Sequence, residues 1–132
     1  MAKKKTVSPS EFELQVLGVL WRDGPSTVRQ ILDRLPDGKK RAYTSVLSVM
    51  QVMEKKGLLA HEKVKGGLAH VYHAKVTQRK VMGPMMRGMV AKVFGGNPAA
   101  AFQQLLSETE VSTDEIAQIR EMLDELEKGK HR

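Results

Sequence analysis

Apolar residues recur at helical spacing in the first half of the chain, and signals for helix starts and stops bracket each run. Ser8-Pro9-Ser10-Glu11 predicts the first start, with Ser8 as the N-cap, Pro9 in the first helical position and Glu11 closing a capping box. The apolar run that follows reaches Trp21 and stops at Asp23-Gly24-Pro25. The first predicted element is therefore an amphipathic helix between these two signals.

Two more helices are predicted before the middle of the chain. Thr27 is expected to cap a short helix, which Pro36-Asp37-Gly38 ends because proline cannot continue a helix and Asp-Gly favours a turn. The next helix is predicted from about Ala42 to Lys56, with Gly57 as its C-cap.

A β-hairpin is predicted after the third helix. Residues 58–64 and 68–74 have the pattern of two strands around Gly66-Gly67, a two-glycine turn. Three helices followed by a hairpin is the element order of a winged helix-turn-helix. The sequence therefore predicts a winged helix-turn-helix domain over residues 1–76.

The second half of the chain, residues 77–132, is predicted to be a helical dimerisation region. Thr77 caps a methionine-rich helix that Gly83-Pro84 is expected to kink or restart, and Asn97-Pro98 and a capping box at 112–115 start two more helices. Three amphipathic helices of this size cannot bury their apolar faces alone, so we expect a second subunit to cover them. The fold class is thus mainly α with a small β-hairpin. The predicted dimerisation residues are Met85, Met86, Met89, Val93, Phe102, Leu105, Leu106, Ile116, Ile119 and Leu123.

Charge is distributed unevenly along the chain. Up to Lys80 there are 16 basic against 7 acidic residues, and beyond it 6 against 8, within a net charge of +7. A basic first part predicts a polyanion partner, of which double-stranded DNA is the expected one. An anionic membrane surface is the alternative, but it would require a basic amphipathic helix with large apolar residues, which this sequence lacks.

Composition excludes several kinds of chemistry. Cysteine is absent, which removes disulfides, thiolate metal sites and cysteine nucleophiles, and indicates a cytoplasmic protein. The basic start is not followed by an apolar stretch, so neither a secretory signal nor membrane insertion is expected. Of the hairpin histidines only His61 and His70 share a strand face, and two ligands make a poor metal site. No nucleophile–base set or phosphate loop is present, so we predict no enzyme, no metal and no cofactor.

The third predicted helix carries the candidate functional surface. On a helical wheel its core stripe is Ala42, Val46, Val49 and Met53, and the opposite side holds small polar residues. Hydroxyl and amide side chains can enter a major groove and read base edges. The predicted base contacts are Thr44, Ser45, Ser48 and Gln51.

Cations around this helix are expected to bind phosphates, which supply affinity without sequence information. A basic run precedes the helix, one lysine lies at its far end, and two more lie in the hairpin, whose glycine tip would let it follow the DNA backbone. The predicted backbone contacts are Lys39, Lys40, Arg41, Lys55, Lys63 and Lys65.

Several segments together resemble the penicillinase-repressor family of bacterial winged-helix regulators. They are SPSEFELQVLGVLW, TVRQILDRL, AYTSVLSVMQVMEKKGLL and a hairpin ending in VYHA. The resemblance implies a homodimer joined by its C-terminal helices, which binds a palindromic operator and represses its own operon. It also implies base contacts from Thr44, Ser45 and Ser48.

The resemblance further implies a membrane-bound sensor protease, which ends repression by cutting in the dimerisation helices, and Gln104-Leu105 lies at the family's cleavage position. Without thiols or a pocket signal to act as a switch, loss of the dimer is the expected end of repression. Local flexibility instead predicts the weakest backbone at Gly83-Pro84 and Gly95-Gly96, so we expect a cut between Val81 and Leu106.

The alternative function is a winged-helix adaptor that binds protein rather than specific DNA, because fold alone does not determine function. Such an adaptor would need a large apolar patch on the third helix, for which Leu47 and Val52 are the only candidates. RNA binding would require exposed aromatic residues for stacking, and aromatics make up only 5% of the chain.

Overall fold

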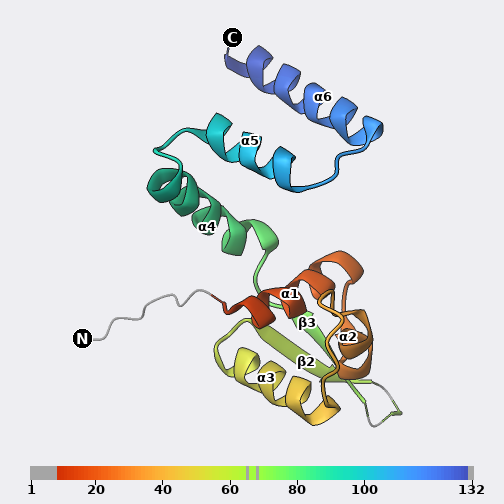
Figure 1. Cartoon of the computed structure of the whole chain (residues 1–132). Helices are drawn as coiled ribbons and strands as arrows, with labels where there is room; N and C mark the ends of the chain where they lie inside the picture. Colours follow the sequence, from red (N-terminus) through yellow and green to blue (C-terminus); the bar gives the residue numbers. More distant parts are fainter. Residues whose placement is uncertain (1–8, 65, 68, 131–132) are drawn as a thin grey trace, which may run out of the picture. The chain divides into compact units, whose positions relative to one another are not determined.

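The computed structural model describes residues 9–64, 66–67 and 69–130 (Figure 1). Contacts divide the chain into two compact units, residues 1–85 and 86–132, with the division inside the fourth helix. The predicted domain boundary after residue 76 lies just before that helix. The elements in chain order are α1 (Glu11–Asp23), β1 (Ser26–Thr27), α2 (Val28–Arg34), α3 (Tyr43–Lys55), β2 (Leu59–Lys63), β3 (His70–Ala74), α4 (Gln78–Val93), α5 (Pro98–Glu108) and α6 (Thr113–Lys130).

The prediction that Ser8 caps the first helix is wrong, since Ser10 is the N-cap of α1. The Ser10 hydroxyl accepts from the Glu13 N–H at 3.2 Å, and the Glu13 carboxylate accepts from the Ser10 N–H at 3.0 Å. Ser10 and Glu13 have the same capping-box spacing as Ser8 and Glu11, and Glu13 gains a further partner from α3. Ser8 itself lies outside the described residues.

The next two helices begin and end close to their predicted limits. Thr27 caps α2 by accepting from the Gln30 N–H at 3.2 Å, as predicted. Helix α3 ends at Lys55 and its C-cap is Lys56, so the prediction of Gly57 as the C-cap is wrong by one residue. Gly57 follows with a φ of 84°, which favours glycine. The N-cap of α3 is Ala42, which has no side chain able to cap the helix.

The sheet has three strands in the order β1-β3-β2, and both pairs are antiparallel. The sequence analysis missed β1, whose Ser26 pairs with Tyr72 of β3. The prediction of a two-residue glycine turn is also wrong. The Val64 N–H donates to the Ala69 carbonyl at 3.1 Å, so four positions separate the last bonded residues of the hairpin.

One hydrophobic core lies between α1, α2, α3 and the sheet. On α3 the buried side chains are Val46, Met50 and Met53. The predicted stripe is therefore correct for two of its four members, whereas Val49 is half-buried and Ala42 is exposed at the helix start. The other buried apolar residues are Val16, Leu17, Val19, Leu20, Val28, Ile31, Leu59 and Tyr72.

Helices α4, α5 and α6 follow, and none of them has a buried residue. Of the expected kink or restart of a helix at Gly83-Pro84, the restart is wrong, because α4 runs through both residues. Proline lacks one N–H and so costs the helix one hydrogen bond, which the rest of α4 tolerates. The predicted caps are confirmed: Asn97 accepts from the Ala99 N–H at 2.9 Å, and Ser112 from the Glu115 N–H at 3.1 Å.

An ion pair joins the start of α1 to the end of α3. The Lys56 ammonium lies 2.8 Å from the carboxylate of Glu13, whose residue is 5% exposed. Burial raises the pKa of the Glu13 carboxyl, but hydrogen bonds from Lys56 and Ser10 outweigh this and hold the pKa below its ordinary value. The pair therefore stabilises the fold at neutral pH.

We predict that Glu13→Gln lowers the free energy of unfolding by about 1 kcal/mol at pH 7, because the glutamine keeps the cap but loses the ion pair. A carboxyl group whose pKa is lowered in the folded state stabilises the fold at pH values above its ordinary pKa. This contribution is lost as the pH falls through the folded-state pKa. The difference from wild type should therefore shrink in denaturant titrations as the pH falls below the ordinary glutamate pKa of about 4.3. Glu11→Gln, at an exposed carboxyl of the same turn, is the control and should show little change.

Candidate nucleic-acid interface

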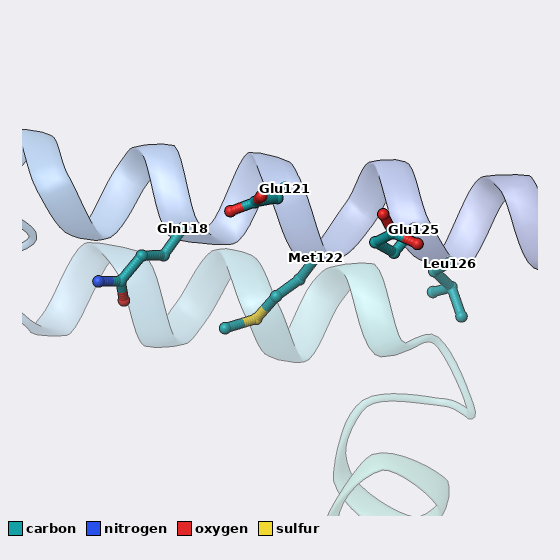
Figure 2. A pocket seen from close by; sticks show the side chains of 5 residues that line it. All are labelled: Gln118, Glu121, Met122, Glu125 and Leu126. Atoms are coloured by element: carbon teal, nitrogen blue, oxygen red, sulfur yellow. The ribbon is translucent and has the colours of Figure 1, made fainter.

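A shallow hollow lies on one face of α6 (Figure 2). All five lining residues come from this helix: Gln118, Glu121, Met122, Glu125 and Leu126. Two acidic and two apolar side chains on a single helix do not form a nucleophile–base set. Within the described residues no group of three potential metal ligands occurs either. This hollow is an apolar strip edged by carboxylates rather than a catalytic site.

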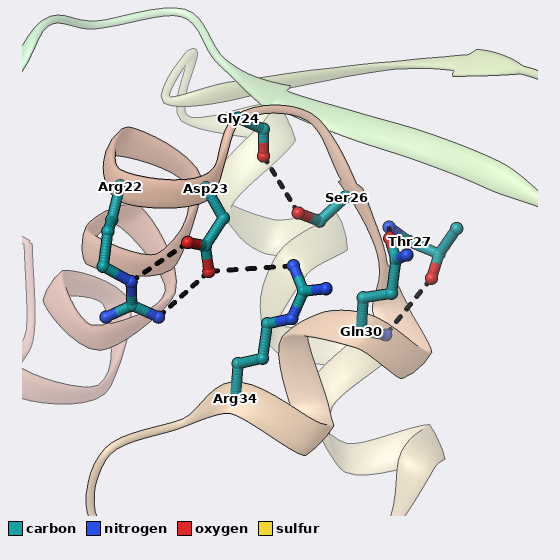
Figure 3. Close-up of polar contacts among 7 residues, drawn as sticks. All are labelled: Arg22, Asp23, Gly24, Ser26, Thr27, Gln30 and Arg34. Atoms are coloured by element: carbon teal, nitrogen blue, oxygen red, sulfur yellow. Dashed lines mark hydrogen bonds and ion pairs between the residues drawn. The ribbon is translucent and has the colours of Figure 1, made fainter.

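The turn between α1 and α2 is held by a small polar network (Figure 3). The Asp23 carboxylate lies 3.0 Å from Arg22 and 3.6 Å from Arg34, and the Ser26 hydroxyl donates to the Gly24 carbonyl at 2.9 Å. The hydrogen bond from Arg22 is the main reason that the pKa of Asp23 lies below its ordinary value. This network fixes where α2 starts, and α2 in turn packs against α3.

The outward face of α3 consists mainly of the predicted polar residues, with the apolar Val52 among them. Its orientation follows from the buried Val46, Met50 and Met53, which lie on the opposite side of the helix. In the described part of the chain the side chains on this face form no hydrogen bond with another residue, so their donors and acceptors are available to a ligand. The exposed polar residues of the face are Thr44, Ser45, Ser48, Gln51 and Lys55.

The N-terminus of α3 opens into a basic hollow. Ala42 supplies no side-chain cap, and the helix has 13 residues, so its dipole leaves partial positive charge at this end. The hollow has a volume of about 480 Å³ and is lined by Leu32 and the four residues 39–42. Uncapped N–H groups beside lysines are a suitable environment for an anionic group such as phosphate.

The three cations before α3 have different surroundings. Lys39 and Lys40 are exposed, whereas the Arg41 side chain is 23% exposed and paired with Asp37. The Arg41 guanidinium also lies 4.1 Å from the centre of the Phe12 ring on α1. Arg41 therefore ties the loop before α3 to α1, a role that the sequence analysis did not anticipate.

Asp37 is the acceptor that organises this loop. Its carboxylate accepts from the Lys39 N–H at 3.1 Å and from the Gln15 amide at 3.2 Å, in addition to Arg41. The backbone hydrogen bond from Lys39 is the largest cause of a pKa below the ordinary aspartate value, and Arg41 and Gln15 add to it. The carboxylate is therefore ionised at neutral pH and holds the loop in place.

Two exposed residues that sequence reasoning missed lie beside the start of α3. The guanidinium of Arg29, on α2, is 5.3 Å from the centre of the Tyr43 ring. This is within the range of a cation–π contact and adds a cation next to the basic hollow. In the sequence Arg29 is one of two arginines in the helix before α3, and nothing in its local context distinguishes it.

The hairpin is linked to α3 through a histidine. The Nδ1 atom of His61 on β2 lies 2.7 Å and 2.9 Å from the two carboxylate oxygens of Glu54 on α3. The His61 ring stacks on His70 of β3 with centroids 4.4 Å apart, so the prediction that these two share a face is confirmed. Lys63 is exposed at the end of β2, and Lys65 lies outside the described residues.

Comparisons with known proteins identify relatives of this chain. The model of a family described as the penicillinase repressor matches residues 9–125. The chain is 34% identical over 122 residues to the transcriptional regulator BlaI of Mycobacterium tuberculosis strain CDC 1551 / Oshkosh, covering 90% of this chain and 85% of that protein. The BlaI regulator of strain ATCC 25618 / H37Rv matches with the same identity and coverage. Among the described residues no helix is long and apolar enough to cross a membrane.

We predict that Arg41→Ala lowers the free energy of unfolding by about 1 kcal/mol, because it uncovers the Phe12 ring and removes the cation–π contact. Lys40→Ala is the matched control, since Lys40 is exposed and should leave stability unchanged within about 0.5 kcal/mol. Thermal and denaturant unfolding of both variants measure the difference. Equal stability of the two variants would show that Arg41 does not hold the loop against α1.

Proposed function

The chain belongs to the penicillinase repressor family, and we propose that it is a transcriptional repressor whose homodimer binds a palindromic operator in double-stranded DNA. The observation that carries the proposal is the outward face of α3, which is polar, exposed and preceded by a basic hollow. Sequencing the DNA fragments that the purified protein retains from a random pool tests it. Retention of a recurring inverted repeat is expected, and retention of random sequence would contradict the proposal.

In this proposal α3 enters the major groove, which is wide enough to admit one helix. Thr44, Ser45 and Ser48 present hydroxyls that can donate to or accept from base edges, and the Gln51 amide can do both at once. All four side chains are exposed on the same face of the helix. Because the core fixes the rotation of α3, these groups are already oriented before DNA arrives.

Phosphate contacts supply the affinity. Lys39, Lys40 and the uncapped N-terminus of α3 form one anion site, and Lys55 lies at the other end of the same helix. Lys63 on the hairpin and Arg29 on α2 are exposed on neighbouring elements. Arg41 contributes less than the lysines to phosphate binding in this scheme, since its guanidinium is already paired with the Asp37 carboxylate. Lys65 remains a proposed contact from the sequence.

The dimer is proposed to form through α4, α5 and α6. Apolar side chains on all three helices are exposed in the single chain, and these helices bury no residue of their own. A second copy that covers these faces would remove them from water and link two DNA-binding units. Of the predicted interface residues, the half-buried ones are Met85, Phe102 and Ile119, and the exposed ones are Met86, Met89, Val93, Leu105, Leu106, Ile116 and Leu123. Exposed Met122 and Leu126 on α6 are added to them in this proposal.

We propose that a membrane-bound sensor protease ends repression by cutting between α4 and α5. Gly95 and Gly96 are exposed, lie outside the helices and have φ values of 61° and 76°. Gln104-Leu105 lies inside α5, where the hydrogen-bonded backbone resists a protease, and Gly83-Pro84 lies inside α4. Limited proteolysis with mass spectrometry locates the first cut, and a first cut within residues 9–74 would contradict this route.

The adaptor alternative receives little support from α3. Among the large apolar residues on its outward side, Leu47 is half-buried and Val52 is exposed, which does not form an extended patch. An adaptor would also bind DNA weakly and without salt dependence, so DNA affinity measured at several salt concentrations distinguishes the two functions.

We predict that α3 side chains and lysines perform different tasks. Ser48→Ala should reduce discrimination between operator and random DNA by about 1 kcal/mol, because one base contact is lost. Lys39→Ala combined with Lys40→Ala should weaken binding to every sequence and reduce the slope of log K against log salt by about 2. Lys128→Ala, near the end of α6, is the control. Fluorescence anisotropy at several salt concentrations measures both effects, and equal effects on specific and random DNA would contradict the division.

We predict that Leu123→Glu converts the dimer to a monomer in sedimentation, because it places a charge in the proposed apolar interface. Operator affinity should fall about a hundredfold or more, since the two half-sites would no longer be bound by linked units. Ala117→Glu adds the same charge on the opposite, polar side of α6 and should remain dimeric. A dimeric Leu123→Glu protein would place the interface elsewhere.

A further inference from the structure

Val52 is the large apolar residue that is exposed among the polar side chains on the outward face of α3. Val52 is 48% exposed and lies between Ser48 and Lys55 on that face. The core does not require it, because Val46, Met50 and Met53 are fully buried on the opposite side. Single exposed apolar residues are common on protein surfaces, but Val52 lies among the side chains proposed to enter the major groove, where it would meet the edges of the bases.

The major groove contains one group that suits an apolar side chain. Thymine is the base that presents a methyl group there, at C5, in addition to the hydrogen-bonding groups that all four base pairs present. A valine pressed against the cytosine amino group would leave a donor unpaired and desolvated, which is costly. A valine against thymine buries two apolar groups. Val52 would therefore favour thymine for two reasons: contact with the methyl group buries apolar surface, and contact with another base would leave a polar group unpaired.

The spacing on α3 fits a single stretch of base pairs. Ser45, Ser48 and Val52 are related by steps of three and four residues and so follow one side of the helix. With a rise of about 1.5 Å per residue, residues 45 and 52 are separated by about 10 Å along the helix axis. This is about three base-pair steps of about 3.4 Å each. Val52 and Ser48 would then contact positions one or two base pairs apart.

We propose that Val52 is a specificity-determining residue that contacts the 5-methyl group of one thymine in each half-site of the operator. The inference rests on the proposed function, because it requires α3 to lie in the major groove. It goes further in assigning a base identity to one residue. In this assignment Ser48 supplies hydrogen bonds to its base pair, and Val52 supplies apolar contact to a neighbouring one.

Uracil substitution tests the proposal, because deoxyuridine differs from thymidine only by the missing methyl group. The probe is the inverted repeat that wild-type protein retains from a random pool, with each thymine replaced in turn in one half-site. At one position we expect wild-type affinity to fall about fourfold, which corresponds to one unburied methyl group. Replacement in both half-sites should cost about the square of that factor.

Variants at Val52 identify the residue responsible. Val52→Ala should bind the thymine and uracil probes with equal affinity at that one position and should keep the wild-type response at all others. Val52→Thr has nearly the same shape but replaces one methyl by a hydroxyl, so its preference for thymine should be smaller than that of wild type. Equal binding of random DNA by all three proteins checks that the variants are folded.

The outcomes separate this inference from the proposed function. An operator that shows no uracil-sensitive position, or one whose sensitivity persists in Val52→Ala, overturns the role of Val52 and leaves the repressor intact. A protein that selects no sequence overturns both proposals. Loss of binding to a protein partner in Val52→Ala, with DNA binding unchanged, would assign the residue to a protein interface and also overturn the thymine contact.

Discussion

The packing of α3 against the first unit determines what the rest of the molecule can present. Val46, Met50 and Met53 have no exposed surface, so rotating the helix about its axis would expose at least one of them and bury a polar residue. A rotation of one residue, about 100°, is enough to exchange a hydroxyl for an apolar side chain on the outward face. The surface of α3 is therefore a consequence of its core, and Thr44, Ser48 and Gln51 are exposed because their opposite neighbours are apolar.

Three polar links hold the ends of α3 in place against α1, the preceding loop and the hairpin. Arg41 joins the loop before it to Asp37 and Phe12, and the Lys56–Glu13 pair joins its end to the start of α1. Glu54 joins it to the hairpin through His61. Exposed ion pairs contribute little to stability singly, but all three links restrict the motion of α3 relative to its neighbours, and the Lys56–Glu13 pair and the Arg41–Phe12 contact connect segments far apart in the sequence. A preoriented helix loses less conformational entropy when it binds a ligand.

Sequence patterns could predict the elements that depend on local chemistry. Thr27, Asn97 and Ser112 were identified as caps because each cap is made within three residues, and the α3 wheel needed only the helical period. The missed features depend on distant partners. Strand β1 has two residues and exists because Ser26 meets Tyr72, and Ser10 rather than Ser8 caps α1 where Glu13 can also reach Lys56. For the same reason no local signal distinguished Arg41 from the neighbouring lysines, since its guanidinium packs on the distant Phe12 ring.

The two units differ in how much apolar surface they can cover by themselves. Residues of the first unit bury a continuous core, whereas α5 and α6 have amphipathic faces and no buried residue. Exposed Leu105, Leu123 and Leu126 are costly in water, so this surface gains the most from a second copy of the chain. Under the proposed function this difference means that operator affinity is controlled through the second unit. The DNA-reading surface needs no partner to form, but tight operator binding needs two linked copies, so any event that separates the copies weakens repression without altering α3.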